Sequence, residues 1–305
     1  MAKKIRSVLT ALPRRQDDGF IIVAVLWILA AMATLASIYA VYVIDTATAF
    51  RAHDDVVEAE GIASAALELT ALQVSQVPQQ PETPRVTNGS FSFRIGNGRA
   101  SVEFRSESAR IDLNAAPKEL LAGLFTGLGA RPDDALKYAD RVIGWRTKPQ
   151  PGQDLEASLY QMSGRRYGPR GAPFEHTGEL WLVHGIPEAL VERALHLVTV
   201  YSGQAQVNAF DAPPAVIAAL PGMTPEILHA FLAQRAQTPQ NGQILSSLLG
   251  AAAPHASIEP TKTTRVSVRV NLDNGRQLGC EAVIFIGETD SQPYRIMSWR
   301  DALDE

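Results

Sequence analysis

An uncharged run of about 25 residues, from Phe20 to Ile44, constrains this chain more than any other feature. A helix of that length rises about 1.5 Å per residue and spans roughly 37 Å, enough to cross a hydrocarbon layer of about 30 Å with some tilt. An ordinary secretory signal has a shorter apolar region of about 7–15 residues and is cut after it. Here the one obvious cut site, Gly19, precedes the apolar run, so we predict a transmembrane helix over residues 20–44.

The segment before this helix is basic. Residues 1–19 contain five Lys or Arg residues and two Asp residues. The positive-inside rule therefore places this segment in the cytoplasm and the chain after Asp45 on the other side of the membrane. A polar leader, a glycine, a phenylalanine and an apolar helix resemble the start of type IV prepilins and type II secretion pseudopilins. The resemblance implies that a prepilin peptidase cuts after Gly19 and that Phe20 is then N-methylated; a plain signal anchor is the alternative.

Ala24 would be the fifth residue of the processed chain. Most members of the resembled families have a glutamate there, which is thought to pair with the amino terminus of the neighbouring subunit. An ionisable group inside a bilayer is unfavourable and normally functional. In type II secretion, the K class of minor pseudopilins typically lacks this glutamate and lies at the filament tip. The resemblance therefore implies a tip-specific apolar position at Ala24, although alanine also suits any apolar anchor.

Composition agrees with a protein that lies largely outside the cytoplasm. Without residues 1–19, 23 basic and 30 acidic residues remain, a net charge of −7. This balance argues against a nucleic-acid partner, which usually requires a basic stripe. Cys280 is the single cysteine, so no intramolecular disulfide can form. We predict that it is a buried apolar residue.

Apolar residues at helical spacing predict that the helix continues over residues 45–77. Three prolines within residues 77–84 then predict a linker. Alternation over residues 90–95 and 99–104, on either side of a glycine turn, predicts a β-hairpin.

Strand patterns return near the end of the chain. Residues 263–270 and 277–286 alternate around an Asn-Gly turn, and residues 294–300 form a last strand pattern. We predict that these strands complete the sheet that the first hairpin begins. The intervening helical segment is then an insertion in a pilin-like domain.

Two segments of that insertion resemble each other. Residues 110–121 and 206–217 each place Asp or Asn before small residues and then a proline that suits a helix start. A glycine turn follows each, at residues 127–129 and 221–223. The segments resemble helix-hairpin-helix or SAM-like units.

Together with residues 139–146, 167–174 and 178–186, these two segments occur in the order typical of K-class pseudopilins. This resemblance covers nearly the whole chain. It implies a non-enzymatic minor pseudopilin at the tip of the type II secretion pseudopilus. Such a protein is anchored in the inner membrane and has its globular part in the periplasm. It supports the export of folded proteins across the outer membrane. The implied partners are other minor pseudopilins, the major pseudopilin, the prepilin peptidase, and the secretion channel or exported substrates.

The predicted fold class is therefore α+β, a long amino-terminal helix and an antiparallel pilin-like sheet with a large all-helical insertion. The predicted divisions begin with a cleaved leader (1–19), a transmembrane segment (20–44) and the continued helix (45–77). The first strands (85–106), a first helical unit (107–205), a second helical unit (206–260) and the final strands (261–305) follow.

Two other functions share these features. A membrane-anchored DNA-uptake protein would also combine an anchor with helix-hairpin-helix turns, whose backbone amides bind phosphate. The candidate turns lack flanking Lys or Arg clusters and the processed chain is acidic, so we expect no nucleic acid partner. A minor pilin of a surface type IV pilus is the second alternative.

The sequence contains no credible enzyme motif. The six histidines show no metal-ligand spacing. We predict surface or capping roles for Glu175, His176, Glu179 and His184. K-class relatives often bind calcium after the segment matching residues 139–146, but here Asp154 and Glu156 are the only carboxylates left beside Lys148. Two carboxylates form a poor calcium cage, so no cofactor is predicted, and these two residues are the weak candidates if calcium binds.

Overall fold

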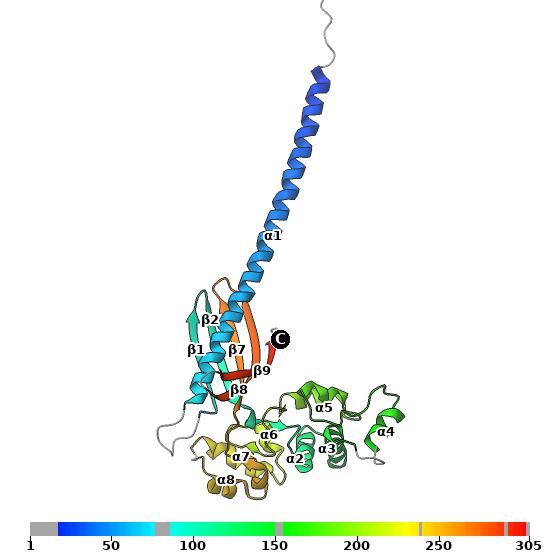
Figure 1. Cartoon of the computed structure of the whole chain (residues 1–305), viewed down its shortest axis with the longest axis vertical. Coiled ribbons are helices and arrows are strands. Elements are labelled where there is room, and N and C mark those ends of the chain that lie inside the picture. The colour runs from blue at the N-terminus through cyan, green and yellow to red at the C-terminus, as the bar shows by residue number, and fades with distance from the viewer. Residues whose placement is uncertain (1–17, 77–85, 150–154, 238–239, 290–291, 303–305) are drawn as a thin grey trace, which may run out of the picture. The chain divides into compact units, whose positions relative to one another are not determined.

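The computed structural model describes residues 18–76, 86–149, 155–237, 240–289 and 292–302 (Figure 1). The chain divides into two compact units, Met1–Glu58 and Ala59–Glu305. Each unit is described by itself below. The predicted linker lies largely outside the described residues.

Helix α1 runs from Asp18 to Ser75. It begins two residues before Phe20 and ends two residues before the predicted end at residue 77. The window with the highest mean hydropathy, 2.6, lies within Phe20–Ser75, and among the described residues this is the one helix that is long and apolar enough to cross a membrane. The hydroxyls of Thr34 and Ser37 donate to the carbonyls of Ala30 and Ala33, so these polar groups are satisfied within the helix itself.

The second unit contains a five-stranded antiparallel sheet in the order β1-β2-β7-β8-β9. Its strands are β1 (Asn88–Ile95), β2 (Gly98–Ser106), β7 (Thr263–Leu272), β8 (Gln277–Thr289) and β9 (Gln292–Ala302). The last residues of β2 pair with the first of β7, as Ser106 lies opposite Thr264. The prediction that the carboxy-terminal strands complete the first hairpin's sheet is confirmed.

Apolar and polar side chains alternate along the strands, so one face of the sheet is apolar and is covered by α1. Inward residues of β2, β7 and β8 pack against the part of α1 from Ala59 to Ala71, where alanines at 59, 63, 66 and 71 allow the helix to approach closely. The opposite, outer face bears the remaining alternate residues, among them Glu103, Arg105 and Arg265. Cys280 is buried on the covered face as predicted, and burial raises its pKa to about 11.

Residues between β2 and β7 form the insertion (Figure 1). Its α-helices are α2 (Lys118–Gly127), α3 (Pro132–Arg146), α4 (Leu155–Met162), α5 (Glu188–Leu195), α6 (Pro214–Ala218), α7 (Pro225–Gln234) and α8 (Gly242–Leu249). Short 3-10 helices are η1 (Glu107–Ala109), η2 (Thr177–Leu182), η3 (Arg235–Gln237) and η4 (Gly250–His255).

The prediction of an all-helical insertion is wrong in one respect. Strand β3 (Ile111–Asp112) pairs in parallel with β4 (Val198–Thr199), and β5 (Val207–Asn208) pairs in parallel with β6 (Ala256–Ser257). Each pair joins the start of a helical stretch to its end. Two-residue strands are too short to show alternation in the sequence, which is why helical spacing alone was visible.

The insertion has one continuous hydrophobic core that extends from Ile111 to Ala256. Helix α2 packs against α6, and Gly123 makes that contact close, because a Cβ there would lie 1.9 Å from the carbonyl oxygen of Ala219. The two helical stretches, whose ends are joined by β3–β4 and by β5–β6, therefore share one core.

Candidate functional site

The predicted processing site lies at the start of the anchor. Gly19 and Phe20 are in the first turn of α1, and Ala24 follows about one turn later. No charged side chain occurs between Phe20 and Ile44, and the large apolar side chains of this stretch are exposed, as a lipid-facing helix requires. Cleavage after Gly19 and methylation of Phe20 remain predictions.

Of the two weak calcium candidates, the structure describes only Glu156. Glu156 lies on α4, and its Oε2 accepts a hydrogen bond from Nη1 of Arg141 at 2.5 Å. Burial raises the pKa of Glu156, while Asp154 lies outside the described residues. No group of three or more His, Cys, Asp or Glu side chains that could hold a metal occurs in the described parts of the chain. One carboxylate already paired with a guanidinium does not suit a hard cation, so no step is assigned to calcium.

The two similar sequence segments form equivalent turns. In the first, Oδ1 of Asp112 accepts the amide hydrogen bonds of Asn114 and Ala115 at 2.7 and 3.2 Å. Its Oδ2 accepts from Oγ of Ser202 and the amide of Gly203 at 3.0 and 2.7 Å, so one buried carboxylate joins both ends of the first stretch.

In the second segment, Oδ1 of Asn208 accepts from the amide of Phe210 at 3.0 Å. Its side-chain amide donates to the carbonyl of Ile258, at 3.4 Å. Asn208 therefore repeats the role of Asp112 with a neutral side chain.

An arginine from a later helix completes each turn. Arg146, the last residue of α3, donates to the carbonyls of Leu113 and Ala116. Arg235 donates to the carbonyls of Ala209 and Ala212, which occupy the equivalent places of the second turn. The repeated sequence phrase thus builds a structural turn held by a half-buried arginine, a partnership that the sequence pattern alone did not reveal.

The glycine turns differ in how open they are. Gly129 adopts a φ of +92°, and a Cβ there would meet no atom within 4 Å. Gly222 adopts +81° but packs against Ala251, with which a Cβ would be 3.1 Å apart. Ala251 therefore leaves less space beside the second turn than there is beside the first.

Of the two roles predicted for the residues near η2, surface or capping, Glu179 has the second. Glu179 is buried, not at the surface, and its Oε2 accepts from the indole Nε1 of Trp145 at 3.0 Å. Its Oε1 accepts from the amide of Glu175 and from Arg170, which preserves a capping role. The contact with Trp145, 34 residues away in the chain, could not be predicted from the sequence.

A buried ion pair joins the sheet to the insertion. Glu107 in η1 is fully buried, and its two oxygens lie 2.7 and 3.2 Å from Nε and Nη2 of Arg265 on β7. Nη1 of Arg265 also lies 2.5 Å from Glu281 on β8, and Thr199 of β4 donates to Glu107. Arg265 is an outward position of an alternating strand, but no sequence signal identified Glu107 as its partner.

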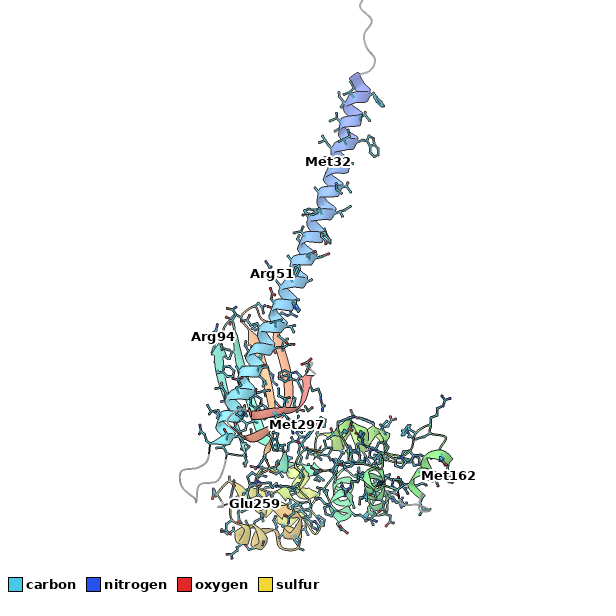
Figure 2. The ribbon with its side chains drawn as sticks, in the orientation of Figure 1. Met32, Arg51, Arg94, Met162, Glu259 and Met297 are labelled. Atoms are coloured by element: carbon cyan, nitrogen blue, oxygen red, sulfur yellow. The ribbon has the colours of Figure 1, made fainter. Side chains whose placement is uncertain are left out.

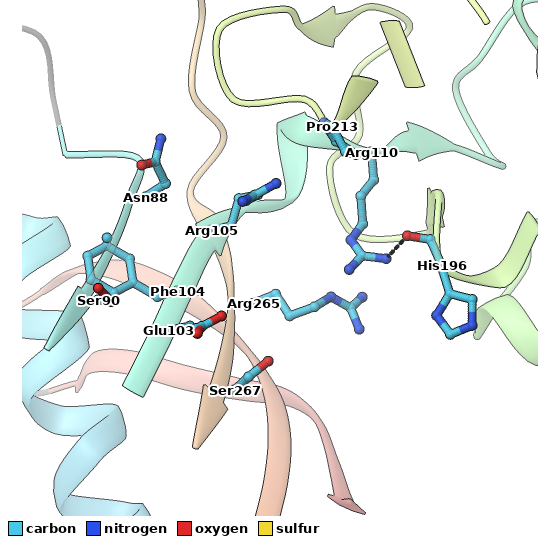
Figure 3. Close-up of a pocket in the computed structure, with 11 residues that line it drawn as sticks. Asn88, Ser90, Glu103, Phe104, Arg105, Arg110, His196, Pro213, Arg265 and Ser267 are labelled. Carbon is cyan, nitrogen blue, oxygen red and sulfur yellow. Dashed lines mark hydrogen bonds between the residues drawn. The ribbon is translucent and has the colours of Figure 1, made fainter. Parts of the chain in front are cut away.

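A pocket of about 460 Å³ lies beside this ion pair, where the outer face of the sheet meets the insertion (Figure 3). Its polar lining includes Asn88, Glu103, Arg105, Arg110 and Arg265. None of these residues had been singled out from the sequence as a site.

Residues 102–203 of the chain match the family described as type II secretion system (T2SS), protein K. No curated protein sequence matches the chain. Among solved structures, the chain is similar in fold to one described as the crystal structure of the GspK-GspI-GspJ complex from the enterotoxigenic Escherichia coli type 2 secretion system. The match has a TM-score of 0.62 at 15% identity and covers 83% of this chain and 99% of that one.

Proposed function

We propose that this chain, whose residues 102–203 match the type II secretion system protein K family, is a minor pseudopilin that forms the tip of the pseudopilus. The match over residues 102–203 is the observation that carries the proposal, because it covers the segment that distinguishes the chain from a simple pilin-like sheet. Helix α1 is long and apolar enough to cross a membrane (Figure 2), and we assign it as the anchor in the inner membrane. We assign the second unit to the periplasm.

The second part of the proposal concerns assembly. The similar solved structure is, by its description, a complex of GspK with GspI and GspJ. We infer that this chain likewise assembles with two other minor pseudopilins and, through them, with the major pseudopilin. Leu69 and Leu72 on α1 support such contacts, because both are exposed apolar residues in the part of the helix that packs on the sheet.

The insertion and the anchor then have separate roles. Cleavage after Gly19 and N-methylation of Phe20 deliver the helix to the filament, and the uncharged Ala24 suits a subunit with no neighbour above it. The insertion prevents further subunits from adding above the tip. The protein acts by assembly, without catalysis, and extension of the filament moves folded substrates toward the outer-membrane channel.

Replacing Gly19 by Leu tests the proposal, because a bulky side chain blocks the extended backbone that the peptidase requires. In cells that lack the native gene, we expect the Gly19→Leu protein to keep its precursor mass and exported proteins to accumulate in the periplasm. Gly61→Leu is the matched control, since Gly61 lies in the same helix and a Cβ there would meet nothing within 4 Å.

The control protein should be processed like the unaltered one. A Gly19→Leu protein of processed mass that restores export would overturn the processing scheme. Unimpaired export in cells without any copy of the protein would overturn the function itself.

A further inference from the structure

Three arginines line the pocket between the outer face of the sheet and the insertion. Arg105 comes from β2, Arg265 from the facing position of β7, and Arg110 from the segment after η1. Arg105 and Arg265 are direct cross-strand partners, an arrangement in which like charges repel. Figure 3 shows the guanidinium groups of Arg110 and Arg265 ending near each other.

The three arginines differ in how many of their guanidinium nitrogens already have an acceptor within the protein. All three guanidinium nitrogens of Arg265 lie against Glu107 or Glu281. Arg110 donates from Nη1 to the carbonyl of His196 at 2.5 Å, while its Nε lies 4.0 Å from Glu107, beyond hydrogen-bond reach. Its Nη2 therefore has no acceptor among the described residues.

Arg105 is exposed, and its guanidinium makes no hydrogen bond or salt bridge with the part of the chain that the structure describes. Burial and the nearby Arg265 lower the pKa of Arg110, while Glu107 and Glu281 oppose that shift. One acidic side chain, Glu103, also lines the pocket. Glu103 belongs to strand β2, and its carboxylate would accept a hydrogen bond from a peptide amide but would repel a second anion.

The rest of the lining suits a polypeptide. Ser90 and Ser267 contribute hydroxyl groups, and Asn88 contributes an amide. Strand β1 is an edge of the sheet, so one side of its backbone faces no other strand of that sheet. Extended peptides bind such edges through main-chain hydrogen bonds, while nearby side-chain pockets select their residues.

We propose that this pocket binds a carboxylate of an extended acidic peptide segment, held by Arg105 and Arg110 on the outer face of the sheet. Guanidinium groups bind carboxylates through paired, charge-assisted hydrogen bonds. Arg265 is a positioning residue that Glu107 and Glu281 hold in place. The inference does not depend on the proposed function, because it concerns binding to the isolated protein.

Fluorescence anisotropy tests the assignment, with full-length protein in an uncharged detergent. The probe is a labelled peptide of alternating serine and glutamate with an amidated carboxyl end, and the comparison peptide has glutamine in place of glutamate. We expect the glutamate peptide to bind roughly tenfold more tightly than the glutamine peptide. Its affinity should fall as NaCl rises from about 50 to 200 mM.

Paired variants locate the site. Arg105→Gln with Arg110→Gln should weaken binding of the glutamate peptide about tenfold. Arg94→Gln with Arg99→Gln removes the same charge from a cross-strand pair at the other end of the β1–β2 hairpin and should leave affinity within about twofold. If the first pair unfolds, Arg105→Gln alone should still weaken binding, because Arg105 is exposed.

Two results would overturn the assignment. One is equal affinity for the glutamate and glutamine peptides; the other is equal weakening by the two variant pairs, which would indicate only general charge attraction. A glutamine peptide with a free carboxyl end distinguishes the source of the carboxylate. Tight binding of that peptide assigns the pocket to a chain terminus, and weak binding assigns it to acidic side chains.

Discussion

Asp211 connects the second helical stretch to the first strand through an incompletely satisfied carboxylate. Its Oδ1 accepts from Oγ1 of Thr87 at 2.9 Å and from Nδ2 of Asn88 at 2.5 Å. Its Oδ2 is buried and has no hydrogen-bond partner among the described residues. Burial therefore raises the pKa of Asp211, with the hydrogen bonds from Thr87 and Asn88 opposing that shift.

Replacing Asp211 by Asn should raise the free energy of unfolding at pH 7 by about 1 kcal/mol, because the amide keeps an acceptor oxygen and removes a buried charge. Asp211→Ala should lower it by about 1–3 kcal/mol, since Thr87 and Asn88 lose their acceptor. Urea unfolding of the full-length protein in detergent measures both changes.

The pH dependence has a definite sign. A carboxyl group whose pKa is raised in the folded state binds its proton more tightly there, so its contribution to stability falls as pH rises from 3.8 through the raised folded pKa. That decline should be smaller in Asp211→Asn. An Asp211→Asn protein less stable than the original protein at pH 7 would contradict this account of Asp211.

At the scale of elements, helix α2 contains two glycines with opposite surroundings. A Cβ on Gly123 would lie 1.9 Å from the backbone oxygen of Ala219, whereas one on Gly127 would meet no atom within 4 Å. Gly123 therefore permits the contact between α2 and the end of α6, and Gly127 makes no such contact.

Gly123→Ala should lower the free energy of unfolding by about 3 kcal/mol or more, because backbone atoms must move apart. Gly127→Ala is the matched control and should be neutral or stabilising by up to about 1 kcal/mol, since alanine favours the helix. Thermal unfolding followed by circular dichroism compares the two. Equal effects at both positions would show that the close packing of α2 is not required.

The sequence predicted the elements whose pattern is local. Proline and glycine marked the helix starts and turns of the insertion, and alternation marked the strands of the large sheet. The strands β3 to β6 were missed because two residues cannot show a period, and their pairing joins segments far apart in the chain. The same reason hid Arg146 and Arg235, whose acceptors lie 23 to 33 residues away.

At the scale of the whole molecule, the insertion begins where β2 ends and returns where β7 begins, between strands that pair directly. Glu107 and Arg265 lie at this junction, and their ion pair is buried. The strand patterns on either side of the helical segment predicted the insertion, but not the buried charges, because partners 158 residues apart leave no local pattern.

Glu107→Gln should lower the free energy of unfolding by about 3 kcal/mol, because Arg265 would stay buried with only Glu281 to balance it. Glu103→Gln is the control, being an exposed glutamate on the neighbouring strand, and should change stability by less than about 0.5 kcal/mol. Chemical denaturation of the full-length variants measures both. Equal stability of Glu107→Gln and the original protein would mean that the junction is held by other contacts.

The most direct test of the central claim is the mass of the amino-terminal peptide, from protein isolated from membranes of cells that have a prepilin peptidase. The account predicts a peptide that begins at N-methylated Phe20, as expected for a processed pseudopilin. A peptide that begins at Met1 or Ala2 in those cells would contradict it and would leave a simple signal anchor.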